Sequence, residues 1–173
     1  MGINFSGLSA QTMTLPDNAF QGGVHITDKK SAGNNGGAFS GGAWRTRDLN
    51  TKEFSWGNVG NVVVGTNTVT PTAGWWLLIW SAPAIRVNDH LSRIYTSWGG
   101  IKAGTTEHAD SAGYENPSRS VGCARFSFNG SQYFQVQHYA STGQSNDYGY
   151  GMGISNNDGR FTEVICLKFI YDS

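Results

Sequence analysis

The stretch AGWWLLIWSAPAIRVNDH, from Ala73 to His90, constrains the fold more than any other part of the chain. It begins within a turn over residues 71–74 and continues with six consecutive apolar residues, 75–80. In an extended strand, one face would carry Trp75, Leu77 and Ile79, and the other Trp76, Leu78 and Trp80. A strand with one face in water would alternate apolar with polar residues, so both faces are expected to be covered. In an all-β protein this indicates the middle of a sandwich, with the second face against another copy of the chain.

The last apolar stretch, Phe161–Tyr171, has the same property. Its even-numbered residues include Val164, Cys166 and Ile170, and its odd-numbered residues include Phe161, Ile165, Leu167, Phe169 and Tyr171. A two-layer sandwich has a single interior, so a second apolar face needs another partner. Two such strands lead us to expect a closed homo-oligomer.

The composition suits a turn-rich β protein and excludes some functions. The 173 residues include 24 Gly and 13% aromatics, and only 14% are charged, whereas typical domains have about 25%. The net charge is zero and no Lys/Arg run occurs, which argues against nucleic-acid binding. The apolar run is too short to span a membrane, and the N-terminus lacks the pattern of a secretory signal.

No stretch has useful helical periodicity, and nine strands are expected. They are 38–49, 61–69, 75–82, 91–97, 101–108, 119–128, 132–140, 149–155 and 161–171. Asn129-Gly130 predicts a two-residue hairpin, because both residues tolerate positive φ angles. Gly99-Gly100 is expected to join its neighbouring strands, and residues 156–159 to close the last hairpin. Short strands with frequent turns favour an antiparallel sandwich or barrel.

Residues 1–34 differ from the rest, since their apolar residues follow no period. Residues 29–37 (KKSAGNNGG) are typical of a flexible joint, so 1–34 are interpreted as an N-terminal arm and 35–173 as the folded domain. The alternative is that the first 34 residues add one or two edge strands. The first six residues also fit the N-myristoylation pattern, a minor alternative.

From about Asn35 to Tyr171 the chain resembles a jelly-roll domain of phage and other virion proteins. That domain is related to the tumour-necrosis-factor and complement globular-head fold. The residues that carry the resemblance are GGAFSGGAWRTRDLNT (36–51), TPTAGWWLLIWSAPAIRVNDHLSRIY (70–95), GTTEHA (104–109), SRSVGCARFSF (118–128), YFQVQHYAST (133–142), YGYGMGI (148–154) and FTEVICLKF (161–169).

The resemblance implies an all-β, antiparallel jelly-roll sandwich of about ten strands that forms a homotrimer. It implies a virion structural protein at the particle surface, either a capsid decoration (cement) protein or a head- or tail-fibre protein. Such a protein acts by assembly, and the arm over 1–34 would bind major capsid or tail proteins. A cellular secreted recognition protein of the complement-like type is another alternative, which the missing signal peptide argues against.

Two groups of residues are candidates for function. The expected core and trimer scaffold consists of Trp75, Trp76, Leu78, Trp80, Ile165, Leu167 and Phe169. Trp98, Tyr114 and Tyr148 lie in or beside polar loops, where aromatic rings can stack on sugars. They support an alternative function, a receptor- or glycan-binding module at a fibre tip that binds a host-surface glycan. The same rings can instead fill gaps at a trimer seam.

No catalytic, metal or cofactor site is expected. His90, His108 and nearby carboxylates lack the spacing of a metal site, and no Gly-x-Ser-x-Gly motif occurs. The glycines of 149–153 precede no helix that could bind a phosphate. Cys123 and Cys166 are expected to be buried thiols, with a disulfide between neighbouring strands as the alternative.

Overall fold

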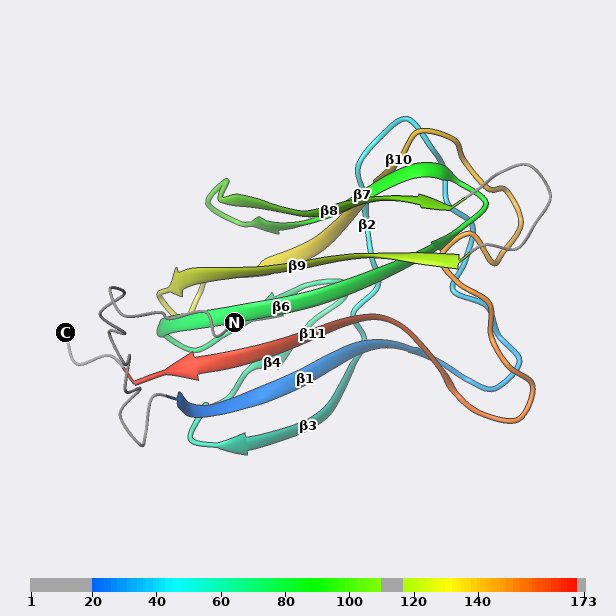
Figure 1. Cartoon of the computed structure of the whole chain (residues 1–173). Helices are drawn as coiled ribbons and strands as arrows, with labels where there is room; N and C mark the ends of the chain where they lie inside the picture. Colours follow the sequence, from blue (N-terminus) through cyan, green and yellow to red (C-terminus); the bar gives the residue numbers. More distant parts are fainter. Residues whose placement is uncertain (1–19, 110–116, 171–173) are drawn as a thin grey trace, which may run out of the picture.

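The structure is a computed structural model and describes residues 20–109 and 117–170 (Figure 1). These residues form eleven strands and no helix. The strands are β1 (Phe20–Lys30), β2 (Arg45–Thr46), β3 (Thr51–Gly57), β4 (Val63–Val64), β5 (Val69–Thr70), β6 (Gly74–Ile85), β7 (Asn88–Thr96), β8 (Ile101–Ala109), β9 (Pro117–Phe128), β10 (Phe134–Ala140) and β11 (Gly159–Phe169). In the described part of the chain, no helix has the length and hydropathy to cross a bilayer.

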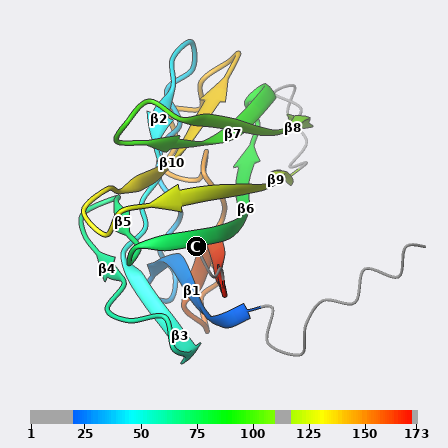
Figure 2. The same ribbon diagram turned by 90° about the vertical axis from the view of Figure 1, so that its left-hand side faces the viewer.

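The strands form two antiparallel sheets that pack face to face. One sheet has the order β3-β1-β11-β6-β9. The other has the order β4-β5-β10-β7-β8, with β2 added beside β10. Figures 1 and 2 show the two layers, with β6 and β9 in one and β7, β8 and β10 in the other. The expected fold, an all-β antiparallel jelly-roll sandwich, is confirmed.

The core lies between the sheets and is built around β6. Trp76, Leu78 and Trp80 point inward and are buried, as are Val164 and Cys166 of β11. The Trp80 ring lies against Gly122 of β9, where any Cβ would overlap with it. The inner face of β6 is therefore the sandwich interior, as the sequence predicts.

The predicted boundary after residue 34 is wrong, because Phe20–Lys30 forms β1 inside the five-stranded sheet. β1 pairs with β11 on one side and β3 on the other, and its Val24 and Ile26 belong to the core. Gly22 and Gly23 interrupt the apolar pattern of this strand, so the pattern did not predict it. The Trp56 ring of β3 lies on Gly23, so a side chain there would overlap with the ring. Residues 1–19 lie outside the described residues.

Several other expected elements differ from the structure. Residues 38–49 contain only the two-residue β2, and residues 149–155 contain no strand. Asn129-Gly130 is a turn but not a hairpin, because it connects β9 in one sheet to β10 in the other. There the Asn129 side chain accepts hydrogen bonds from Ser131 and Gln132, which stabilises a longer crossing.

Other expectations hold in part. Gly99-Gly100 joins β7 and β8, which pair as a hairpin. Cys123 and Cys166 are both free thiols and Cys166 is buried as expected, but the expectation of a buried Cys123 is wrong, because Cys123 lies on the outward side of β9 and is exposed. At one end of the five-stranded sheet, the rings of Phe20 in β1 and Phe169 in β11 contact each other, with centroids 4.9 Å apart.

Candidate functional site

The outward side of the five-stranded sheet, here the apolar outer face, is the strongest candidate for function. The strand register sets one row of outward residues across all five strands: Phe54, His25, Ile165, Ile79 and Cys123. The next row is Trp56, Gly23, Leu167, Leu77 and Arg125. Four of the strands thus contribute apolar side chains to one continuous surface.

Much of this surface is open to solvent in the single chain. Phe54 is 57% exposed, and Ile79 and Ile165 are 39% and 37% exposed. Trp75, at the start of β6, is half-buried beneath the Arg125 guanidinium, which lies 4.2 Å from its ring centroid. Monomeric proteins seldom leave a contiguous apolar surface of this kind in water, so a face like this one indicates a contact with protein.

Charged groups border the apolar outer face at one end, and they are paired. Arg119 lies 2.9 Å from Glu163, and Arg160 lies 2.8 Å from Glu53. His25 Nε2 lies 3.4 Å from Glu163 Oε2 without the geometry of a hydrogen bond. The border resembles the polar rim that surrounds the apolar centre of protein interfaces.

The structure divides the predicted scaffold residues between two surfaces. Trp76, Leu78 and Trp80 lie in the core. Trp75, Ile165, Leu167 and Phe169 alternate to the other side and lie on the apolar outer face. The sequence predicts that one face lies in the sandwich, and Trp76, Leu78 and Trp80 lie there, whereas the trimer contact of the other face stays a prediction.

The predicted ligand loops do not come together. Trp98 packs edge-on against Phe128, 5.1 Å between centroids, near the start of β6. The Tyr148 hydroxyl accepts hydrogen bonds from Arg86 and Asn146, beyond the opposite end of β6. Both rings have structural contacts and lie at different ends of the sandwich. The third candidate, Tyr114, lies outside the described residues.

A buried polar network inside the sandwich was not predicted. Arg47 is 1% exposed and donates hydrogen bonds to Thr162 Oγ1, Pro83 O and Tyr150 O, at 2.7, 3.2 and 3.2 Å. Its guanidinium also stacks on the Tyr150 ring, 3.7 Å from the centroid. Burial lowers the pKa of Arg47 to about 10, which leaves it charged at neutral pH.

The network continues through two histidines to the other sheet. Arg47 Nη1 lies 3.4 Å from His138 Nδ1, His138 Nε2 lies 2.8 Å from His90 Nδ1, and His90 Nε2 lies 2.7 Å from Ser118 Oγ. Arginine only donates, so His138 accepts at Nδ1 and donates from Nε2. His90 in turn accepts from His138 and donates to Ser118. Every bond then runs in one direction, from Arg47 to Ser118.

The direction of these hydrogen bonds argues against a catalytic role for Ser118. A serine nucleophile needs a histidine nitrogen that accepts its proton, whereas His90 presents a donor to Ser118. The third group is a cation instead of the carboxylate that would stabilise a charged imidazole. Burial, followed by the charge of Arg47, holds the pKa of His138 well below its usual value, and burial lowers the pKa of His90 to about 4. The arrangement suits a structural link between the sheets.

His90 and His108, the histidines considered for a metal site, make other contacts. His90 belongs to the buried network, and His108 Nδ1 lies 3.0 Å from Asp89 Oδ1 at the surface. Within residues 20–109 and 117–170, no three His, Cys, Asp or Glu side chains gather as metal ligands would.

Comparison with known proteins establishes the fold. No family model and no curated protein sequence matches the chain significantly. Among solved structures, murine APRIL aligns with a TM-score of 0.55 and 9% identity, covering 86% of this chain and 98% of that one. PRD1 vertex protein P5 aligns with a TM-score of 0.52 and 11% identity, covering 87% and 99%. The globular domain of zebrafish complement 1qA protein has a TM-score of 0.48 and 11% identity, covering 88% and 97%.

These neighbours confirm the resemblance at the level of fold. Murine APRIL and PRD1 vertex protein P5 carry this conclusion, since both share the sandwich over most of this chain. At this identity the likeness concerns architecture alone, and the function has to be argued from the surface of this protein.

Proposed function

We propose that this protein is a virion structural protein that assembles as a homotrimer on the particle surface. The observation that carries the proposal is the apolar outer face, which the single chain leaves in water. The shared fold of PRD1 vertex protein P5 supports the virion setting. The buried network supports a role without catalysis, since its hydrogen bonds link the two sheets and present no base to the Ser118 hydroxyl.

The apolar outer face is suited to closed self-association. Phe54 and Trp56 lie at the free edge strand β3, while Ile79 and Ile165 lie in the middle of the same sheet. A neighbour placed over this sheet would cover both the apolar centre and the exposed edge. Closed cyclic symmetry covers the face on every copy, whereas an open contact would leave one face uncovered at each end.

Within this class we propose a capsid decoration (cement) protein or a head- or tail-fibre protein. Because β1 occupies residues 20–30, the anchor to major capsid or tail proteins is assigned to residues 1–19. Three arms on one trimer multiply individually weak contacts, since the second and third bind at a high effective concentration. Trp98 and Tyr148 form no common surface, so the glycan-binding alternative is not proposed.

Light scattering on the purified full chain tests the assembly. We expect a mass of three chains for the wild type and of one folded chain for Ile165→Glu, since a carboxylate would then be buried in the apolar contact. Val63→Glu, at a position that is 50% exposed on the other sheet, is the matched control and should keep the trimer. A wild-type monomer at micromolar concentration, or an unaltered Ile165→Glu trimer, contradicts the proposal.

Deletion of residues 1–19 tests the anchor separately. The shortened chain should keep its three-chain mass and lose sedimentation with particles of the parent virion. Unchanged sedimentation would assign attachment to the sandwich itself.

A further inference from the structure

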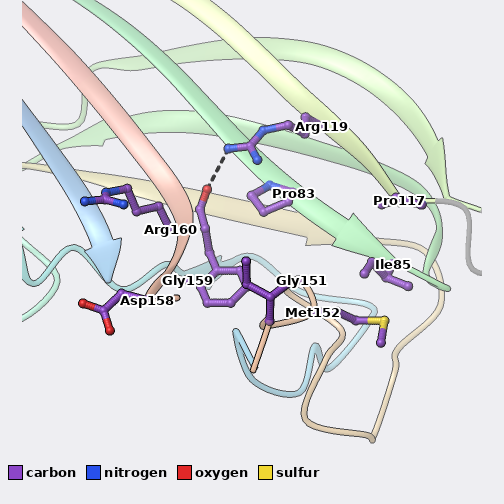
Figure 3. Close-up of a pocket in the computed structure, with 11 residues that line it drawn as sticks. Pro83, Ile85, Pro117, Arg119, Gly151, Met152, Asp158, Gly159 and Arg160 are labelled. Carbon is purple, nitrogen blue, oxygen red and sulfur yellow. Dashed lines mark hydrogen bonds between the residues drawn. The ribbon is translucent and has the colours of Figure 1, made fainter. Parts of the chain in front are cut away.

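A cavity of about 410 Å³ opens at the end of the sandwich where β11 begins. Its walls come from four segments: the end of β6, the start of β9, the start of β11 and the loop before it. Figure 3 shows Pro83 and Ile85 of β6, Gly151 and Met152 of the loop, and Pro117 of β9 around it. The volume falls in the range of ligand-binding pockets, about 300–1,000 Å³.

The buried network fixes these walls from inside. Arg47 bonds to Pro83 O, to Tyr150 O beside Gly151, and to the Thr162 hydroxyl beside Phe161. The histidine chain continues from Arg47 to Ser118, beside Pro117. All four segments are thus tied to one hydrogen-bonded unit, which preorganises the pocket.

Two glycines shape the space around Phe161, a buried residue of the lining. A Cβ on Gly151 would lie 2.5 Å from Phe161 Cδ1, and a Cβ on Gly159 would lie 2.8 Å from Phe161 Cζ. Side chains at either position would displace the ring. Glycine at both sites therefore leaves room for the Phe161 ring and for the cavity beside it.

The charges at the rim are internally balanced. Arg119 pairs with Glu163, Arg160 with Glu53, and Asp158 with Lys29 at 2.9 Å. Figure 3 shows Arg119 directed toward a backbone oxygen, which is that of Phe161 at 2.8 Å. Three cations face three carboxylates, so the rim offers no excess charge to an ionic ligand.

The rim is also apolar and open. Met152 is 46% exposed and Ile154 is 58% exposed, both on the loop that forms one wall. Exposed methionine and isoleucine beside a pocket are typical of protein contacts, in which one side chain fills the pocket and its neighbours cover the rim. Along the outward side of β11, Glu163 lies between Ile165 of the apolar outer face and Phe161 of the pocket, and it pairs with Arg119. The pocket therefore lies beyond the charged border of the apolar outer face, outside the contact proposed for a second copy.

We propose that this pocket binds an uncharged aromatic or branched aliphatic side chain presented by a protein partner other than a second copy of this chain. The pocket supplies apolar walls, and the balanced rim excludes charged side chains through the cost of desolvating them. Only one part of this inference rests on the proposed function, namely that the occupant of the pocket belongs to a protein.

Methyl NMR of the full chain, with labelled Met and Ile, tests the pocket. The probes are N-acetyl-tryptophanamide, N-acetyl-leucinamide and, as a charged comparison, N-acetyl-lysinamide. We expect the first two to shift the methyl signals of Met152, Ile85 and Ile154 saturably at millimolar concentration, and the third to leave them unchanged. Ile101, 48% exposed on the other sheet, is the reference signal and should not move.

Matched variants connect the shifts to the pocket. Ile154→Asp should reduce the shift of Ile85 at least fivefold, and Ile101→Asp should leave it intact. Both positions are exposed, so both variants should fold, which the remaining methyl signals verify.

Each other outcome overturns the proposal. Equal shifts at Ile101, or no shifts, exclude the pocket as a binding site. If the neutral dye 1-N-phenylnaphthylamine binds and neither neutral amide does, the pocket is a site for a free small molecule. If the pocket signals change when dilution converts trimer to monomer, the occupant of the pocket is a second copy of this chain. Masses measured on the same samples separate this result from the proposed function, because a monomer that binds the amides refutes only the trimer.

Discussion

His138 donates a hydrogen bond from Nε2 to His90 Nδ1 over 2.8 Å, with Arg47 beyond one ring and Ser118 beyond the other. The chain holds only while both rings are neutral, because a second proton on either ring would place two donors face to face. The sandwich interior therefore contains a group that acid disrupts.

Acid should destabilise the protein through these histidines. In the unfolded chain a histidine has a pKa near 6.5, and in the folded protein burial lowers the pKa of His90 to about 4 and that of His138 well below its usual value. Between these values the unfolded chain binds more protons, so the free energy of unfolding falls as the pH falls from about 6.5 to about 4. We expect a loss of roughly 1 kcal/mol per pH unit for each histidine.

Urea unfolding at pH 7.5, 6.5, 5.5 and 4.5 measures this slope. His108 and Asp89 act on the pKa of His90 less than burial and Glu107 do, so His108→Gln is the control and should change the slope little. A free energy of unfolding that stays constant over this interval would show that the rings are already protonated or solvated.

Arg47→Lys should lower the free energy of unfolding by about 3 kcal/mol. A lysine ammonium cannot reach Thr162, Pro83 O and Tyr150 O with the spread of a guanidinium, and a buried charge with fewer hydrogen bonds is costly. Arg45→Lys is the control, since Arg45 is exposed and makes one bond of 3.3 Å to Ser40 O. Equal midpoints for the two variants in urea would refute the role of Arg47.

Gly122→Ala should cost about 1–3 kcal/mol, because the new methyl group would overlap with the buried Trp80 ring. Adding Trp80→Phe, which removes part of that ring, should make the double variant more stable than the sum of the two single losses predicts. Strictly additive losses in urea denaturation would show that the two residues do not interfere.

The two cysteines report on the apolar outer face. Cys166 is buried, and burial raises the pKa of its thiol, so it should not react with Ellman's reagent in the native protein. Cys123 is exposed and aligned with Ile79 on the apolar outer face, so the trimer should protect it. Its reaction should be at least tenfold faster in Ile165→Glu, and equal rates would place the interface elsewhere.

The core of the five-stranded sheet can be predicted from the sequence, but its strand β1 cannot. Alternation along 75–80 predicts both the buried row of Trp76, Leu78 and Trp80 and a second covered face. The pattern of β1 is broken by Gly22 and Gly23, whose meaning depends on Trp56, a residue distant in the sequence. Trp80 is a core residue, so Trp80→Asp would test folding, whereas Ile165→Glu tests assembly.

The buried network could not be predicted from spacing, because Arg47, His90 and His138 come from three separate segments. One signal was present. In the stretch from Phe134 to Ala140, His138 takes an inward position in a row of otherwise apolar residues. A histidine there has to find hydrogen-bond partners inside the protein, although the sequence does not say which.

The contact between Phe20 and Phe169 has a consequence for the connectivity of the domain. Because β1 and β11 are adjacent and antiparallel inner strands, Phe20 and Phe169 meet at one end of the five-stranded sheet, while the cavity lies at the other end of β11. A short linker between these two residues should permit circular permutation of the described domain, with new termini opened at Gly99-Gly100. The same geometry lets a fusion made at Phe20 or at Phe169 attach the domain at one end and leave the end with the cavity free for display.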